Sequence, residues 1–296
     1  MKRVALSNDI ELSKLVYGMW RLTDDSDCSP EYVTKKIMQC LEQGITTFDQ
    51  ADIYGDYEAE KILGNALSKN KSLRNKIEIV TKCDIIAPCG KYKQEPIKYY
   101  DTSTKHLTYS VESSLTNLCI DSIDLLLLHR PDPLMNAEET GKTLDELITS
   151  GKIKAAGVSN FKPWDWTLLQ SRMQNRLLIN QIEFSLIHHD PLTNGDLSFH
   201  YTSNTPIMAW SPLGGGKLIQ ASGELLKVLE ATAANYNADI ATIAIAWLLA
   251  CPMEVLPILG TNKLARIENL SKATKINMDR KTWYKLYSAA LGHEVP

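Results

Sequence analysis

The sequence predicts an α/β fold of the (β/α)8, or TIM, barrel class, with a β-hairpin at the N-terminus and a helix at the C-terminus. Eight short apolar runs recur along the 296 residues, and segments with helical spacing separate most of them. Such runs are typical of parallel strands covered on both faces, and their alternation with helices is typical of βαβ units. Eight units in roughly 250 residues match a barrel, although strand counting alone leaves a doubly wound sheet as the alternative.

The expected elements follow one another along the whole chain. A hairpin that closes the bottom of the barrel is expected at residues 2–14, and a final helix with a short tail at 275–296. The eight strands are expected at 15–20, 45–49, 77–82, 123–129, 155–160, 177–184, 206–210 and 255–261. The helices expected between them include 30–43, 56–68, 104–118, 137–150 and 163–171. No Pro-, Ser- or Gly-rich linker interrupts this order, so we expect one domain over residues 1–296.

The composition favours a cytoplasmic protein without a nucleic-acid or membrane partner. With 44% hydrophobic and 23% charged residues the chain can bury a sizeable core, and its net charge of −3 gives no sign of a polyanionic partner. No run reaches the ~18 apolar residues of a membrane span. No export signal precedes the six cysteines, which lack CxxC pairs, so reduced thiols are expected. The oligomeric state is left open, and a monomer is compatible with the sequence.

Polar residues end most of the expected strands. Asp49, Lys82 and His129 end the second, third and fourth. The later strands end on Asn160, on Glu183 with Gln181 just inside it, on Trp210 and on Thr261. Barrel active sites are assembled at the C-terminal ends of several strands. These endings therefore predict one convergent site.

Four residues near these endings suit the reduction of a carbonyl group. Taken singly, each has an ordinary structural explanation, as a strand-end charge, a rim tyrosine or a core histidine. Taken together, Tyr54 can act as a general acid if a cation lowers its pKa from about 10. Lys82 about 4 Å away would contribute up to ~4 kcal/mol, or roughly three pKa units. Asp49 would keep that lysine charged, and His129, as a neutral imidazole, would orient the carbonyl oxygen.

Motifs that contain these residues resemble those of the aldo-keto reductases, of the bacterial NADP-dependent type. They are FDQADIYGDYEAEKILG, IVTK, DLLLLHRPD, GKIKAAGVSNF, NQIEFS, AWSPLGGGKL and PILGTNKLARIEN, in order from Tyr17 to Asn269. The resemblance implies a (β/α)8 barrel that reduces an aldehyde or ketone to an alcohol with NADPH. It also implies that Asp49 holds Lys82, and that Lys82 tunes Tyr54 as the proton donor.

The resemblance further implies that three segments bind NADPH (NADP+ after the reaction). The residues implied at the nicotinamide are Ser159, Asn160, Gln181 and Trp210, with Trp210 where the family often has a stacking tyrosine. Those implied along the pyrophosphate are Ser211, Leu213, Gly215 and Lys217. Those implied around the adenosine 2′-phosphate and the adenine are Thr261, Lys263, Arg266 and Asn269.

Two departures from the family pattern affect cofactor and substrate selectivity. Many relatives have a lysine where Gly260 stands, so one phosphate-binding cation is missing and Lys263 is the candidate to replace it. The chain after Asn269 is short, which suggests an open site without a long C-terminal loop. Trp20 and the loop at 84–103 are the expected walls of the substrate pocket.

A second function is compatible with the same motifs. Regulatory subunits similar to the potassium-channel β subunits bind the cofactor on this fold and sense redox state, without turning over metabolites. The complete set of four reactive residues favours catalysis over that alternative. A metal site is not expected, because His188, His189 and Asp190 lack further ligands at metal-binding spacing.

Overall fold

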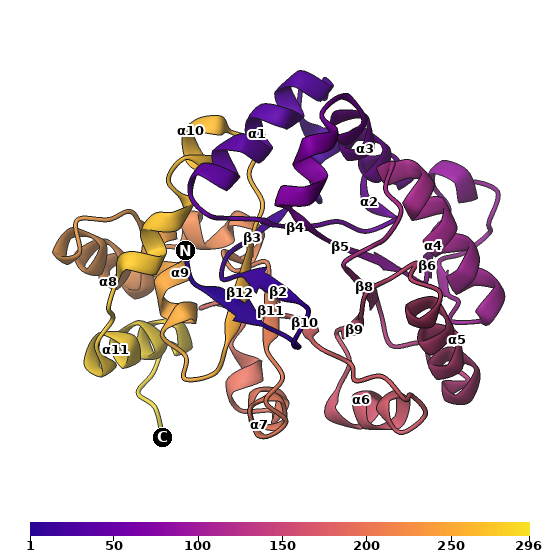
Figure 1. Cartoon of the computed structure of the whole chain (residues 1–296). Coiled ribbons are helices and arrows are strands. Elements are labelled where there is room, and N and C mark those ends of the chain that lie inside the picture. Colours follow the sequence, from indigo (N-terminus) through magenta and orange to yellow (C-terminus); the bar gives the residue numbers. More distant parts are fainter.

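A closed barrel of eight parallel strands forms the centre of the molecule in the computed structural model, which describes all 296 residues (Figure 1). The strands are β3 (Val16–Gly18), β4 (Thr47–Asp49), β5 (Glu78–Cys83), β8 (Leu125–Leu128), β9 (Ala156–Ser159), β10 (Asn180–Glu183), β11 (Ile207–Trp210) and β12 (Val255–Leu259). They neighbour one another in chain order, and β12 pairs with β3 to close the ring. The (β/α)8 prediction is confirmed, and the doubly wound alternative is wrong because the sheet has no free edge.

Helices surround the ring of strands (Figure 1). They are α1 (Pro30–Glu42), α3 (Ala59–Lys69), α4 (Thr104–Leu118), α5 (Ala137–Thr149), α6 (Pro163–Gln170), α7 (Asp196–Thr202), α8 (Gly223–Asn235), α9 (Ile240–Leu249), the short α10 (Leu264–Ile267) and the final α11 (Arg280–Leu291). Local sequence explains their starts, since Ser29, Ser103 and Asn136 each accept a hydrogen bond from a backbone N–H of the first turn. No helix has both the length and the apolar character that a membrane crossing requires.

The expected helix at 56–68 begins later than predicted. The short element α2 (Tyr54–Tyr57) itself contains three residues with positive φ, Gly55, Asp56 and Tyr57, and the regular helix α3 starts only at Ala59. A run of left-handed residues cannot continue a right-handed helix. The apolar spacing of this segment could not show that interruption.

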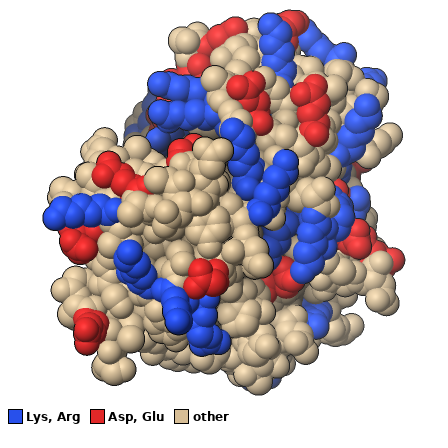
Figure 2. All heavy atoms as spheres, turned by 90° about the vertical axis from the view of Figure 1, so that its left-hand side faces the viewer, with Lys and Arg blue, Asp and Glu red and all other residues tan.

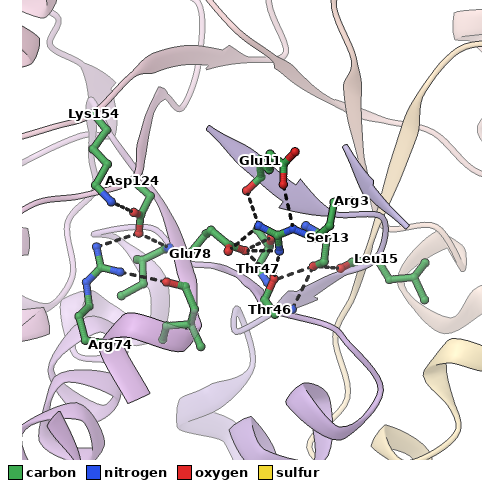
Figure 3. Close-up of polar contacts among 12 residues, drawn as sticks. Arg3, Glu11, Ser13, Leu15, Thr46, Thr47, Arg74, Glu78, Asp124 and Lys154 are labelled. Carbon is green, nitrogen blue, oxygen red and sulfur yellow. Dashed lines mark hydrogen bonds and ion pairs between the residues drawn. The ribbon is translucent and has the colours of Figure 1, made fainter. Parts of the chain in front are cut away.

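The predicted N-terminal hairpin is confirmed and lies across one end of the barrel (Figure 1). Its strands β1 (Arg3–Ala5) and β2 (Glu11–Ser13) are antiparallel, and Val4 and Leu12 pack into an apolar cluster with the barrel residues Val16 and Val80. At the rim, Figure 3 shows the Arg3 guanidinium facing Glu78 at the start of β5, with Thr46 and Thr47 beside them. The hairpin therefore closes the end of the barrel where the strands begin. The end where the strands finish remains open and can hold an active site.

Candidate active site

Asp49, Lys82 and Tyr54 form one hydrogen-bonded group at the C-terminal ends of β4 and β5. The Lys82 ammonium donates to both Asp49 carboxylate oxygens, at 2.8 and 2.9 Å, and to the Gln50 carbonyl at 2.7 Å. It lies 3.0 Å from the Tyr54 hydroxyl. The Lys82 side chain is fully buried, and Asp49 is 2% exposed. A buried carboxylate at a strand end is thus explained by the buried ammonium that it neutralises.

The local backbone places Tyr54 over this ion pair. β4 and β5 are neighbouring strands, and Asp49 lies opposite Val80. Lys82 is two residues further along β5, and its side chain extends across to Asp49 at the end of β4. The turn after Tyr54 requires Gly55, because its φ is +57° and a Cβ there would lie 2.2 Å from the Thr23 methyl group. The glycine beside Tyr54 therefore permits both the turn and the contact with the neighbouring loop.

The pKa of Tyr54 differs from the sequence-based expectation. Burial raises it above its ordinary value, and the Lys82 charge, which lowers it, offsets only part of that effect. The predicted net fall towards neutrality is therefore wrong for this structure, because desolvation of a tyrosinate outweighs the nearby cation. Burial lowers the pKa of Lys82, but Asp49 and Tyr54 together raise it above its ordinary value. At neutral pH the structure thus has a protonated Tyr54 beside a charged Lys82.

His129 lies on the other side of Tyr54, directly after β8. The two rings meet edge to face with their centroids 5.9 Å apart. Burial lowers the pKa of His129 well below its ordinary value, and Lys82 and Arg130 act in the same direction. The imidazole is therefore neutral, as predicted, and its Nδ1 atom is buried without a hydrogen-bond partner.

The residues expected at the nicotinamide are joined to this group by hydrogen bonds. Gln181 on β10 donates to Asp49 at 2.7 Å, and the Ser159 hydroxyl donates to the Gln181 carbonyl at 2.9 Å. Asn160 donates to the Ser159 hydroxyl and accepts from the Trp210 indole at 2.9 Å. The structure thus brings four predicted residues from β9, β10 and β11 into one chain that ends at Asp49.

The glycine-rich segment after β11 offers open backbone beside Trp210. Ser211, Gly214, Gly215 and Gly216 all have positive φ. A Cβ at Gly215 or Gly216 would have no atom within 4 Å, so another molecule can approach this backbone closely. Leu213 is partly buried against the core, and Lys217 is exposed. These features, with the amide groups beside Asp49, fit a nicotinamide dinucleotide.

The segment expected at the 2′-phosphate follows β12 and includes α10. The Tyr17 hydroxyl donates to the Thr261 carbonyl at 2.7 Å, which fixes the start of the segment to β3. Lys263 and Arg266 are exposed, and Asn269 is partly exposed. This segment lies on the side of the molecule that Figure 2 presents, where Lys and Arg side chains form an irregular band with Asp and Glu scattered among them.

Arg21 connects these two segments and was not predicted from the sequence. Its guanidinium donates to the Gly215 carbonyl at 3.4 Å, and its own carbonyl accepts from Asn262 at 2.5 Å. The adjacent Trp20, the expected pocket wall, is 59% exposed, and the Arg21 guanidinium lies 5.2 Å from its ring centroid. Met19 N–H donates to the Asp49 carbonyl, so Trp20 lies at the same end of the barrel as the buried ion pair.

Arg130 is a second residue that sequence reasoning missed. Its guanidinium lies 5.9 Å from the Trp210 ring centroid, and its charge lowers the pKa of both Tyr54 and His129. The side chain is half-buried and takes part in no hydrogen bond or ion pair of the protein. The sequence did offer one indication of its role, because Arg130 directly follows His129 at the end of an expected strand.

The other expected pocket wall, the loop at 84–103, is more ordered than its sequence suggested. It contains a two-stranded antiparallel sheet of β6 (Ile85–Ile86) and β7 (Tyr99–Tyr100). The Tyr57 hydroxyl donates to the Ile85 carbonyl and accepts from Ala87 N–H, each at 3.1 Å. The loop is thereby attached to the turn that follows Tyr54.

Comparison with known proteins gives a consistent result. A sequence model described as the Aldo/keto reductase family matches residues 14–290. The chain is 54% identical to a 6-dehydroglucose reductase of Agrobacterium fabrum, over 100% of both chains. It is 40% identical to oxidoreductase YdhF of Escherichia coli, over 97% of this chain and 96% of that one.

Solved structures give the same fold. The crystal structure of the thermostable aldo-keto reductase Tm1743 with the inhibitor epalrestat matches with a TM-score of 0.82 and 27% identity, over 98% of this chain and 100% of that one. An aldo/keto reductase from Klebsiella pneumoniae, in complex with NADP and acetate, matches with a TM-score of 0.81. Its identity is 21%, over 100% of this chain and 96% of that one, so this likeness supports the fold alone.

Proposed function

This chain belongs to the aldo-keto reductase family of NAD(P)H-dependent oxidoreductases, and from that premise we propose that it reduces a sugar aldehyde to the alcohol with NADPH. The observation that carries the proposal is the 3.0 Å contact between the Tyr54 hydroxyl and the buried Lys82 ammonium, beside a neutral His129. A proton donor and a hydrogen-bond donor thus meet at one place. A carbonyl oxygen placed there could accept from both.

The roles of the residues follow from their protonation states. When bound, NADPH supplies the hydride that forms the new C–H bond at the carbonyl carbon. Tyr54 gives its proton to the carbonyl oxygen, forming the O–H bond, and Lys82 stabilises the resulting tyrosinate. Asp49 holds Lys82 in place and keeps it charged. His129 donates a hydrogen bond that orients the carbonyl before transfer.

The cofactor would be held by the segments that the site brings together. Ser159, Asn160 and Gln181 offer amide and hydroxyl groups to the nicotinamide carboxamide, and Trp210 offers an aromatic face. The open backbone at Gly215 suits a pyrophosphate, beside Ser211 and Lys217. Lys263 and Arg266 are the cations available to a 2′-phosphate. They support a preference for NADPH over NADH.

The proposed substrate class rests on the relative and on the mouth of the site. A relative with 54% identity is named for 6-dehydroglucose, which is glucose with an aldehyde at C6. The half-buried Arg130 guanidinium lies 5.9 Å from the Trp210 ring centroid, has free N–H donors, and lowers the pKa of both Tyr54 and His129 through its charge. Hydroxyl groups on a sugar offer acceptors for such donors. The exposed Trp20 provides an apolar face at the same end of the barrel.

Steady-state oxidation of NADPH tests this function. We expect the enzyme to turn over 6-dehydroglucose with a higher kcat/KM than it shows for benzaldehyde or methylglyoxal. The Tyr54→Phe variant is the matched control, since it keeps the ring and should bind NADPH while losing turnover. Tight NADPH binding without turnover of any carbonyl would contradict catalysis and favour a redox-sensing subunit. Turnover of the other aldehydes alone would contradict only the sugar substrate.

A further inference from the structure

Asp84 has a backbone conformation that residues other than glycine rarely adopt. It lies two residues after Lys82, is fully buried, and has φ of +104°. Such a conformation is strained for a residue with a Cβ, and it persists only where the surroundings hold it. Its Oδ1 atom is also buried without a hydrogen-bond partner. Both features oppose stability, so they call for a functional explanation.

The Asp84 carboxylate accepts a backbone hydrogen bond just beyond the end of the β5–β8 ladder. The last ladder pair is Cys83 with Leu128, and His129 N–H still donates to the Cys83 carbonyl at 2.9 Å. Asp84 then turns away, and its Oδ2 atom accepts from the Arg130 N–H at 3.1 Å. The backbone N–H that the strand no longer satisfies is thus satisfied by a side chain.

Asp84 also closes the loop at 84–103. Its carbonyl accepts from Asp101 N–H at 2.9 Å, where the loop returns to the barrel. One residue therefore joins the end of β5, the segment after β8 and the base of this loop. The contact with Arg130 leads to a guanidinium that makes no hydrogen bond or ion pair with the protein.

We propose that Asp84 is a positioning residue that places the Arg130 guanidinium for the hydroxyl groups of the sugar substrate. The inference rests on the proposed function and adds a determinant of substrate affinity to it. The next residue, Pro131, has no backbone N–H. The hydrogen bond from the Arg130 N–H to Asp84 is therefore not followed by one from the next residue. From its strained backbone conformation the Asp84 carboxylate accepts from the Arg130 N–H.

The Asp84→Gly variant separates this role from a structural one. Glycine adopts a φ of +104° without strain, so the variant should keep a melting temperature close to that of the wild type. Loss of the contact with Arg130 should raise KM for 6-dehydroglucose by about 10-fold, the usual worth of one hydrogen bond. KM for propanal, which has no hydroxyl groups, should not change, and kcat should change little for either substrate.

Two further variants control the test. Asp84→Asn keeps an acceptor oxygen and tolerates positive φ, so it should restore most of the sugar affinity. Cys119 also has positive φ, but it is exposed and lies at the end of α4. Cys119→Gly should therefore leave both KM values unchanged.

Several outcomes would overturn the inference. An unchanged KM for the sugar aldehyde in Asp84→Gly, or an equal rise for propanal, would exclude positioning of Arg130. A large fall in melting temperature that Asp84→Asn does not correct would indicate a structural role. If Arg130→Gln raises the sugar KM while Asp84→Gly does not, the proposed function stands and this inference fails. Failure of the wild type with every hydroxylated aldehyde would defeat the proposed function itself, and with it this inference.

Discussion

The strands β4 and β5 carry a charged group at each end, and the two groups differ in burial and in the polar atoms around them. At the bottom of the barrel, Glu78 of β5 accepts from Arg3 at 2.8 Å and from Thr46 and Thr47 at 2.7 and 2.9 Å. At the top, Lys82 of the same strand pairs with Asp49 of β4. Both groups join the same two strands, and three residues of β5 lie between Glu78 and Lys82.

The bottom group is satisfied and partly exposed, whereas the top group is buried among unsatisfied atoms. The Arg3 and Glu78 side chains are 35% and 20% exposed to solvent, and neither has a buried polar atom without a hydrogen-bond partner. Near the top, Asp52, Asp84 and His129 all have buried polar atoms without partners. Unsatisfied polar groups lower stability unless a ligand uses them. The comparison teaches that one pair of strands has a group suited to fold stability at one end and, at the other, the group to which we assign the chemistry.

The largest effect is expected from Tyr54→Phe at the top. Loss of the general acid should lower kcat by around 10²–10⁴, while NADPH affinity and melting temperature stay close to those of the wild type. Steady-state kinetics and a cofactor titration measure the two quantities. A kcat near the wild-type value would remove Tyr54 from the mechanism.

The next effect is expected from Lys82→Met. Because Asp49 is left as an unpaired buried charge, the free energy of unfolding should fall by about 3–5 kcal/mol. The Lys82 charge lowers the pKa of Tyr54, so its removal should shift the alkaline limb of the pH–rate profile to higher pH. Denaturant unfolding and a pH series measure the two effects. A profile that does not move would show that another group tunes Tyr54.

Arg266→Ala tests the exposed cations after β12, which belong to neither of the two groups. Losing one charge-assisted contact of roughly 1.5–3 kcal/mol should weaken NADPH binding by about 10–150-fold. NADH affinity should hardly change, because NADH has no 2′-phosphate. Quenching of tryptophan fluorescence can follow both titrations. Equal losses for the two cofactors would indicate a structural role for Arg266.

Glu78→Gln is the matched test at the bottom. The variant removes the charge that Arg3 pairs with while keeping one acceptor oxygen, so unfolding free energy should fall by about 1–3 kcal/mol. Because the site lies at the other end of β5, kcat and KM should remain those of the wild type. If turnover fell together with stability, the two ends of the strand would not be independent.

The smallest effect is expected from pH at Asp52. Burial raises the pKa of its carboxyl well above the ordinary value, with Glu60 acting in the same direction. The unfolded chain therefore releases this proton first, and stability declines as pH rises from about 4 towards the folded pKa. Each unit of difference corresponds to about 1.4 kcal/mol. Unfolding at several pH values should show a weaker decline in Asp52→Asn, and equal slopes would contradict this assignment.

The sequence predicted the barrel and most of the top group because both depend on local patterns. Apolar runs such as Leu125–Leu128 are fully buried strands, as their composition indicated. Polar residues after such runs meet because parallel strands end at the same face. Asp49, Lys82 and His129 could therefore be placed together without coordinates.

Other features depended on surroundings that no local pattern contains. The left-handed turn at Gly55–Tyr57, the attachment of Tyr57 to the loop at 84–103 and the free Arg130 guanidinium each require knowledge of which segments meet. The net pKa shift of Tyr54 is the clearest case. Its sign depends on the balance between the charge of Lys82, which sequence reasoning supplied, and the degree of burial, which it did not.

By itself, then, the sequence determined the order of the strands and the chemical types of residue at their ends, because apolar periodicity and strand direction are local properties. Only the tertiary structure decided which of those residues are desolvated, which polar atoms keep a partner, and that Asp84 has a strained backbone. Desolvation and hydrogen-bond satisfaction are set by every atom around a group, and those atoms come from distant parts of the chain.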